Sequence, residues 1–481
     1  MRTRAVSASI ICLSLVVAAC GGDDDDSADA SEAPAATTAP ATDTTAPDAT
    51  GAPDESVAPT SPATSEAPAT DDDATGVVVG DDGRLVPTEC VGHNVASEAD
   101  GVTETSANIA ALSIDFKSLY DIGYSNTERA PATVFAAMAE AVNAAGGVCG
   151  RTLDVQVITY DVLQGQAGQA CVEATEDRTN VFLIASSYDQ PQCITDTGLP
   201  ANVATEITAA DLAAANGLLF SRNPLLEQQY AATIQHAQQD GALAGKVGVW
   251  YGHLFPGVGN TVESVVLPAL DEAGVEYVSF RTEGNDRAAV TSAATHFVSE
   301  GVETLLMFVG PSDVTGIQTE INAQGASPRY LSAPVSGNSS NELFAEKFGT
   351  ASFTSGQQYI TYNWNPTEVR PDDPIGPSCT AWWAELTDEV LEPGTFDYQV
   401  ITSMCVQLDE LVAAMSIAGG DLTRASMVAA YEQLPPHEAG NLLGELAWSP
   451  DHHAGPNVFS VQTFDGETLT STTSTDFFEV D

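Results

Sequence analysis

A chain of 481 residues with 67 acidic and only 15 basic side chains has a formal net charge of −52, which would repel the phosphate backbone of a nucleic acid. Its hydrophobic fraction of 43% is that of a folded protein, but its length exceeds what one hydrophobic core normally supports. We therefore expect at least two globular units and no nucleic-acid partner.

The N-terminus has the pattern of a targeting segment. Arg2 and Arg4 precede an apolar run over residues 5–19, which is short for a membrane span. Small residues then lead to Cys20, in a pattern that resembles the lipidation site of bacterial lipoproteins. We predict a signal peptide at 1–19 and a lipid on Cys20 that anchors the chain at the extracytoplasmic face of the cell membrane. An ordinary secretory signal with a chance cysteine is the alternative.

Residues 20–88 are predicted to be a lipid-anchored, disordered linker. From residue 21 to about 75 the sequence is dominated by Asp, Ala, Pro, Thr and Ser, and it contains no Lys or Arg. Such a segment cannot bury enough apolar surface to fold, and its prolines and charges keep it extended as a tether. Residues 77–101 are expected to be an irregular lead-in to the first domain.

The cysteines predict disulfides and no metal. Six remain when the signal peptide and Cys20 are set aside, and an even number in an exported chain predicts three bridges, for which fifteen pairings exist. Our preferred set is Cys90–Cys149, Cys171–Cys193 and Cys379–Cys405. Asp451, His452 and His453 lie in a Pro- and Gly-rich segment that favours a turn over a metal site. We expect neither a metal nor another cofactor.

The first α/β unit is clearest over residues 131–161. Apolar residues at helical spacing run to Gly146 and Gly147, which favour the end of a helix, and a β-branched strand follows. Strands are expected at 108–114, 153–158 and 181–185, further extended segments at 201–208 and 218–221, and helices at 131–145 and 166–179.

The same alternation then restarts. Strands are expected at 246–251, 275–280, 304–309 and 329–331, and helices at 225–239, 257–273, 286–300 and 312–324. Strands alternating with helices of this length predict parallel sheets with right-handed crossovers, and two such runs predict two lobes. An extended segment at 359–365, helices at 378–391, 398–417 and 423–434, a strand at 457–464 and a polar tail complete the chain.

The order of these features resembles the type I periplasmic substrate-binding proteins of ABC transporters, in the branched-chain amino acid (Leu/Ile/Val) binding family. The resemblance covers roughly residues 106–464. Its most specific motif is NAAGGVCGR at 143–151, followed by NLLGELAWSPDHHAGPN at 441–457. It implies an α/β fold of two Rossmann-like lobes with parallel sheets, joined by a three-crossing hinge.

The resemblance also implies that each lobe consists of two stretches of chain. The first lobe would contain residues 89–223 and 358–441, and the second lobe residues 224–357 and 442–481. The crossings would fall near 222–224, 356–360 and 441–446.

In this family the ligand lies between the lobes, at the carboxyl ends of the strands, as open α/β sheets favour. Carried onto this chain, the resemblance implies ligand-binding residues in both lobes. From the first lobe these are Tyr120, Tyr124, Ser186, Ser187, Tyr188, Ile207 and Thr208. From the second lobe they are Tyr251, His253, Phe255, Gly310, Ser312 and Val335.

One of these positions bears on the ligand. The glutamate that neutralises the ammonium group in amino-acid binders of this family falls on about Val335. Asp189, Glu206 or Asp313 could take its place, or the ligand lacks an ammonium group, because a buried ammonium without a carboxylate is costly. We favour a carboxylate, an amide or another polar solute.

No catalytic motif stands beside this resemblance: the sequence has no G-x-S-x-G elbow, P-loop, H-E-x-x-H or G-x-G-x-x-G. The resemblance therefore implies a monomeric binding protein and not an enzyme. It would capture a small polar organic solute by hinge closure and deliver it to an ABC permease. A ligand-sensing receptor component is the alternative, and a secreted hydrolase is a more remote one.

Overall fold

The computed structural model describes residues 76–480, except 91, 122–124, 126, 187, 189, 253–256, 283–286, 335–354, 366–367, 369 and 371–372. The predicted signal peptide, Cys20 and most of the predicted linker lie outside the described residues. So do six residues singled out in the sequence: Tyr124, Ser187, Asp189, His253, Phe255 and Val335.

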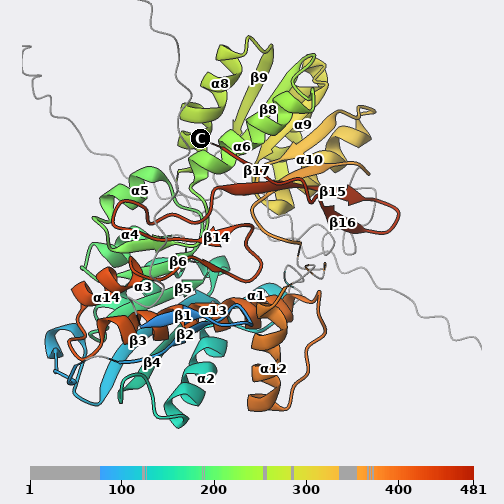
Figure 1. Ribbon diagram of the computed structural model, residues 1–481. Coiled ribbons are helices and arrows are strands. Elements are labelled where there is room, and N and C mark those ends of the chain that lie inside the picture. The colour runs from blue at the N-terminus through green and yellow to red at the C-terminus, as the bar shows by residue number, and fades with distance from the viewer. Residues whose placement is uncertain are drawn as a thin grey trace, which may run out of the picture. The chain divides into compact units, whose positions relative to one another are not determined.

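The first lobe is built on a sheet whose described strands are all parallel, in the order β4-β3-β5-β6-β7 (Figure 1). They are β3 (Ser106–Ile114), β4 (Thr152–Tyr160), β5 (Phe182–Ser186), β6 (Ala201–Ala204) and β7 (Leu219–Ser221). The strand order reverses beside β3, because β4 and β5 flank it on opposite sides. Such a switch point is where open α/β sheets place their ligands.

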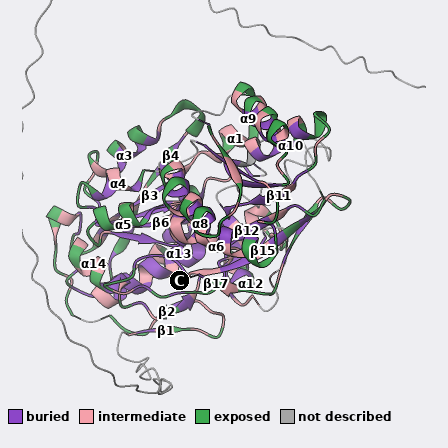
Figure 2. Cartoon of the chain, turned by 90° about the horizontal axis from the view of Figure 1, so that it is seen from above, coloured by how far each residue is buried: buried purple, intermediate pink, exposed green. Residues whose placement is uncertain are grey.

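Helices cover both faces of this sheet. They are α1 (Phe116–Asp121), α2 (Pro131–Ala144), α3 (Ala167–Thr175), α4 (Pro191–Thr195), α5 (Ala209–Ala214), α12 (Ile375–Thr387), α13 (Phe396–Ala418) and α14 (Arg424–Tyr431). Alternate residues of β3 join opposite cores: Ile109 packs with α2 and α13, and Ala110 with α3 and α4. The outer turns of α3 and α5 are exposed (Figure 2). Strands β3, β5, β6 and β7 are thus largely buried on both sides, as parallel sheets require, whereas the edge strand β4 has exposed residues.

The α2–β4 step forms as the sequence predicts. Pro131 begins α2, where its missing N–H costs no hydrogen bond. Gly147 ends the turn after α2 with a φ of 72°, and a side chain there would overlap the carbonyl oxygen of Arg151. Only glycine fits this position without strain.

The second lobe repeats the first. Its sheet has the order β16-β15-β12-β11-β10-β8-β9, with β17 beside β15. Parallel pairing joins β8 (Val247–Gly252), β9 (Tyr277–Thr282), β10 (Thr304–Phe308), β11 (Arg329–Ser332) and β12 (Gln358–Thr361). The antiparallel strands are β15 (Val458–Asp465), β16 (Thr470–Thr473) and β17 (Phe478–Glu479). A second switch point lies beside β8, so the predicted fold class is confirmed.

The helices of the second lobe are α6 (Leu226–Gln239), α7 (Val258–Thr261), α8 (Leu267–Glu272), α9 (Arg287–Glu300) and α10 (Pro311–Ala323). The helix predicted at 257–273 is divided by a π turn at Val262–Val266. Pro268 has no N–H to donate to the carbonyl of Ser264, four residues earlier. The helical hydrogen bonds shift by one residue here, and the Leu267 N–H donates to the Val262 carbonyl, five residues earlier.

Two boundaries of the predicted lobes are wrong. The second crossing was predicted at 356–360, with the lobe boundary at 358. However, β12 pairs with β11 and β15 of the second sheet. The chain therefore leaves the second lobe only after Thr361. The stretch from 442 was assigned to the second lobe. However, β14 (Glu445–Leu446) pairs with β13 (His437–Glu438), and the Trp448 indole donates to the Ser221 carbonyl at 3.1 Å. The chain rejoins the second sheet at Val458.

Both ends of the described chain are more ordered than predicted. The tail expected to be polar contains β16 and β17. The predicted linker ran to residue 88, but β1 (Val77–Val79) and β2 (Leu85–Pro87) form a hairpin against α13. Val77 and Leu85 are buried, and Arg84 pairs with Asp409 at 2.8 Å. The first lobe therefore begins with this hairpin.

Replacing Arg84 with alanine is expected to lower the free energy of unfolding by roughly 1.5–3 kcal/mol, the range for a hydrogen bond to a charged group. Arg84 lies over the Trp382 ring at 4.9 Å, and its loss leaves the buried carboxylate of Asp409 without its cation. Urea unfolding measures the change. Arg287→Ala is the control, because this side chain is 90% exposed. Equal stability of the two variants would contradict a structural role for the hairpin.

All three predicted disulfides are confirmed. Cys90–Cys149 joins the lead-in to the turn before β4, Cys171–Cys193 joins α3 to α4, and Cys379–Cys405 joins α12 to α13. Among the residues that the structure describes, every bridge lies in the first lobe. Helix α13 is long and apolar enough to cross a membrane, but 78% of its apolar window is buried, and it is the core helix of this lobe.

Candidate functional site

The predicted ligand residues that are described lie at the carboxyl ends of strands. Ser186 ends β5 and is partly exposed. Tyr120 lies on α1 after β3 and is 47% exposed. Gly310 precedes α10, which follows β10, and Ser312 lies in the first turn of that helix. The two switch points thus bring these positions to the sheet edges where a ligand is expected.

Two of the predicted residues have core side chains. Tyr188 is fully buried; its hydroxyl donates to the Ala167 carbonyl at 3.1 Å, and its ring meets Tyr160 edge-on at 5.6 Å. Ile207 packs in the same core, and its carbonyl accepts from the Leu226 N–H at 2.9 Å. Their side chains pack in the core of the first lobe, and the contact of these two loop positions with a ligand stays a prediction.

The hydroxyl of Thr208 is used by the protein itself. It caps α5: it accepts from the Asp211 N–H at 3.1 Å and donates to the Asp211 carboxylate at 2.7 Å. A side chain on Gly257 in the second lobe would lie 2.8 Å from the Thr208 methyl group. Thr208 therefore lies against the second lobe as part of a helix cap.

Glu206, a candidate partner for a ligand ammonium, is fully engaged within the protein. One carboxylate oxygen accepts from Gln229 at 2.5 Å and the other from the Tyr362 hydroxyl at 2.8 Å. Burial raises the pKa of Glu206, and these two hydrogen bonds partly offset the rise. Each oxygen of Glu206 therefore already has one hydrogen-bond partner within the protein.

Asp313 is the remaining described candidate. It lies in the first turn of α10, and its N–H bonds to the Gly310 carbonyl at 3.0 Å. Burial raises the pKa of its carboxyl to about 6. Within the part of the chain that the structure describes, no cation contacts this carboxylate.

Tyr251, near the end of β8, is held by residues that the sequence did not single out. Its hydroxyl donates to Glu263 at 3.2 Å, and Arg281 donates to the same oxygen at 2.8 Å. Burial, together with the Glu263 charge, raises the pKa of Tyr251. Glu263 projects from the π turn, and π turns are frequent at functional sites. A helix-interior proline after β8 was the available sequence signal.

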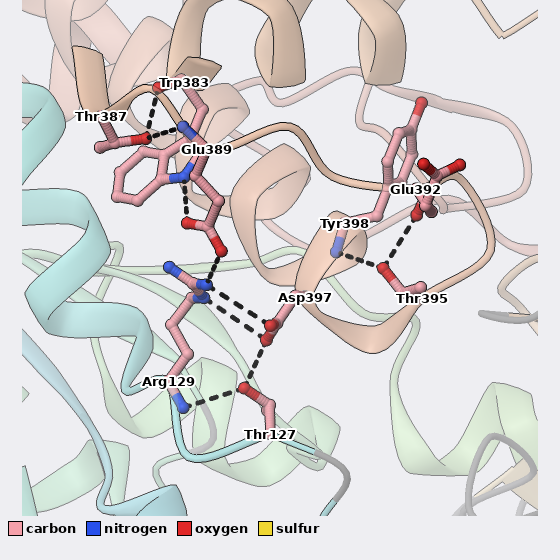
Figure 3. Close-up of polar contacts among 9 residues, drawn as sticks. All are labelled: Thr127, Arg129, Trp383, Thr387, Glu389, Glu392, Thr395, Asp397 and Tyr398. Carbon is pink, nitrogen blue, oxygen red and sulfur yellow. Dashed lines mark hydrogen bonds and ion pairs between the residues drawn. The ribbon is translucent and has the colours of Figure 1, made fainter.

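A second unpredicted group fixes the carboxyl edge of the first sheet (Figure 3). Arg129, just before α2, donates to Glu389 at 2.7 Å and to Asp397 at 3.4 Å. The Thr127 hydroxyl also donates to Asp397, and the Trp383 indole donates to Glu389 at 3.0 Å. The start of α13 is thereby held beside the start of α2.

Two aromatic rings meet at the same edge. Phe116 begins α1 after β3, Phe396 begins α13, and their rings meet edge-on with centroids 6.0 Å apart. They supply apolar surface beside the predicted position of Tyr120. No local pattern marked the pair, because its members are far apart in the sequence.

A cavity also lies beside the second crossing, lined by residues that include Trp364, Arg370 and Tyr398. None of the predicted ligand residues lines its described walls. Its charged groups serve the fold: Arg370 pairs with Glu438 at 3.0 Å, and Glu368 accepts from the Thr473 N–H at 3.0 Å. We therefore do not place the ligand there.

The comparisons with known proteins agree with this architecture. A model for periplasmic binding proteins matches residues 123–468. A fatty acid ABC transporter substrate-binding protein from Thermomonospora curvata has a TM-score of 0.59 and 16% identity, covering 81% of this chain and 95% of that one. A branched-chain amino acid ABC transporter structure from Thermus thermophilus with bound valine has a TM-score of 0.60 and 14% identity, covering 78% and 97%.

A leucine-binding protein from Thermotoga maritima has a TM-score of 0.56 and 12% identity, covering 78% of this chain and 99% of that one. A comparison with curated proteins finds no match. Identities this low establish the shared fold, and the family model matches well over half of the chain. The chain therefore belongs to the periplasmic binding protein family and has the two-lobed type I fold of the ABC transporter substrate-binding proteins.

Proposed function

We propose that this protein is a lipid-anchored, extracytoplasmic solute receptor that works as a monomer and delivers its ligand to an ABC permease. The family match over residues 123–468 is the observation that carries the proposal. The two switch points support it, because they direct loops from both sheets toward one ligand. Contacts from the second lobe would then stabilise a closed form around the bound solute.

The ligand we propose is a small carboxylate or amide without an ammonium group. Valine stands at about the glutamate position of the amino-acid binders, and Glu206 is occupied by Gln229 and Tyr362. The related protein described as a fatty acid transporter component supports a carboxylate ligand on this fold. Ser186 and backbone N–H groups at the strand ends would hold the polar group, and Phe116 and Phe396 would contact the apolar part.

Calorimetry with protein that has been unfolded and refolded to remove bound solute tests this ligand class. We expect short-chain monocarboxylates or their amides to bind, and leucine and valine to bind at least about 100-fold more weakly, a difference of roughly 2.7 kcal/mol. Ser186→Ala should weaken carboxylate binding, and Ser292→Ala on the outer face of α9 is the matched control. Submicromolar leucine binding that is lost in Asp313→Asn would identify Asp313 as an ammonium anchor and refute this proposal.

A receptor that serves a sensor instead of a permease is the second candidate function. Both functions use the same hinge closure, and the partner separates them. Reconstituted transport of the bound solute by a permease encoded beside this chain would support delivery. Activation of a neighbouring sensor kinase, with no permease stimulated, would support sensing.

A further inference from the structure

We propose that Glu206 is a positioning residue of the hinge, whose partly buried carboxylate joins two of the chain crossings and sets how freely the lobes turn. This role goes beyond the proposed function, because it concerns the hinge and not the identity of the ligand.

Four segments meet at this carboxylate. Glu206 belongs to the β6–α5 loop of the first lobe. Gln229, on α6 of the second lobe, donates to Glu206 at 2.5 Å and to the Pro224 carbonyl at 2.9 Å, and Pro224 lies in the first crossing. Tyr362, just beyond β12 in the second crossing, donates to the other Glu206 oxygen at 2.8 Å. A single side chain therefore links both crossings to the first lobe.

The electrostatics make this arrangement sensitive to geometry. Among the described residues, the titratable groups that interact electrostatically with Glu206 are Tyr230 and Tyr362. Glu227 adds a further negative charge near Tyr230. No cation of the described chain balances the Glu206 carboxylate. An unpaired buried carboxylate is costly, and here two neutral donors offset that cost. A rotation that withdraws either donor removes a protein partner from a partly buried carboxylate oxygen. The hydrogen bonds therefore favour a narrow range of angles between the lobes.

Neighbouring backbone contacts place the pivot at the same loop. The Leu226 N–H at the start of α6 donates to the Ile207 carbonyl at 2.9 Å. The Ala209 N–H donates to the Glu227 carboxylate at 3.1 Å. During a hinge rotation, atoms move least near the pivot, so contacts between the lobes are retained there. A solute that contacts the loop at Thr208 would therefore act directly on the pivot.

The interlobe distance in the ligand-free protein tests this role. Spin labels carried by non-natural amino acids at Glu176 on the first lobe and Ser292 on the second leave the disulfides intact, and both positions are exposed. Double electron–electron resonance then gives the distance distribution for the full chain without its signal peptide. Glu206→Ala and Tyr362→Phe should each broaden or shift the distribution. The double variant should match Glu206→Ala, because the Tyr362 hydroxyl acts through the carboxylate.

Two further variants separate positioning from general destabilisation. Glu206→Gln should keep the wild-type distribution, since an amide can accept from Gln229 and donate to the Tyr362 oxygen. Asp409→Asn alters a buried carboxylate within the first lobe alone, so it should lower the melting temperature without changing the distribution. An unchanged distribution in Glu206→Ala would overturn the proposal, as would independent, additive effects of Glu206→Ala and Tyr362→Phe. No ligand is needed, so these outcomes leave the proposed function untouched.

Discussion

Replacing Glu410 with alanine is expected to destabilise the protein by about 3–5 kcal/mol, the cost of removing one partner from a buried ion pair. The Glu410 side chain is 0% exposed in the middle of α13. It accepts from Arg222 at 2.6 Å and from Asn202 at 2.7 Å, and His437 Nε2 lies 3.2 Å away. Without this carboxylate, the guanidinium of Arg222, which is 3% exposed, forms no other ion pair with the residues that the structure describes.

The pH dependence of this contribution follows from the same contacts. Burial alone would raise the pKa of Glu410, but the charge of Arg222 and the hydrogen bonds from His437 and Asn202 outweigh it and lower the pKa below its ordinary value of 4.5. A lowered pKa in the folded state stabilises the protein above pH 4.5, and that contribution is lost as the pH falls below this value. The wild type should lose more stability than Glu410→Ala on acidification.

Urea unfolding at pH 7 and at successively lower pH measures both effects. Glu300→Ala is the control, because Glu300 pairs with Lys246 on the surface, where an ion pair contributes little. Its unfolding curve should match that of the wild type. If Glu410→Ala were as stable as this control, the prediction would be wrong, and the buried ion pair with Arg222 would not stabilise the fold.

Removal of the Cys379–Cys405 bridge by a double alanine substitution is expected to cost roughly 3–4 kcal/mol. The bridge closes a loop with a sequence separation of 26 residues, for which chain entropy alone gives about 3.5 kcal/mol. Both cysteines are fully buried between α12 and α13, so the lost sulfur atoms also leave a packing defect.

The Cys90–Cys149 bridge provides a discriminating comparison. Its loop is longer, with a separation of 59 residues, but Cys90 is exposed. If chain entropy alone mattered, Cys90–Cys149 would stabilise the protein more, because its loop is longer. Packing has the opposite effect, because Cys379 and Cys405 are buried and their removal leaves a packing defect. We expect the two double variants to have similar stabilities in urea. A much greater loss on removing Cys90 and Cys149 would show that chain entropy dominates and that the α12–α13 packing adds little.

Local patterns were sufficient for many elements of the two lobes, but not for the short helices α1 and α5. Helical spacing and two glycines predicted α2, and β-branched runs predicted β4 and β5, because each of these signals lies within one element. The hairpin β1–β2 was missed although its sequence contains Asp82-Gly83, a recognised turn signal, between the apolar runs Val77–Val79 and Leu85–Pro87. The acidic linker before it concealed that signal.

The hinge could not be located in the same way. An extended segment at 358–361 has the same pattern whether it crosses between lobes or pairs in a sheet, and only its neighbours β11 and β15 decide. For the site, the sequence predicted which loops lie at the strand ends but not where their side chains point. Tyr188 and Glu206 are oriented by Ala167, Gln229 and Tyr362, contacts that no local pattern encodes.

The order of the disulfides along the chain has a consequence for oxidative folding. Of the six cysteines in the described chain, each is joined to the next one in sequence: Cys90 to Cys149, Cys171 to Cys193 and Cys379 to Cys405. In a polypeptide that is translocated N-terminus first, every second one of these six cysteines finds one unpaired thiol of the six already exported. An oxidase that joins these six thiols in order of arrival would therefore produce the native connectivity without a disulfide isomerase.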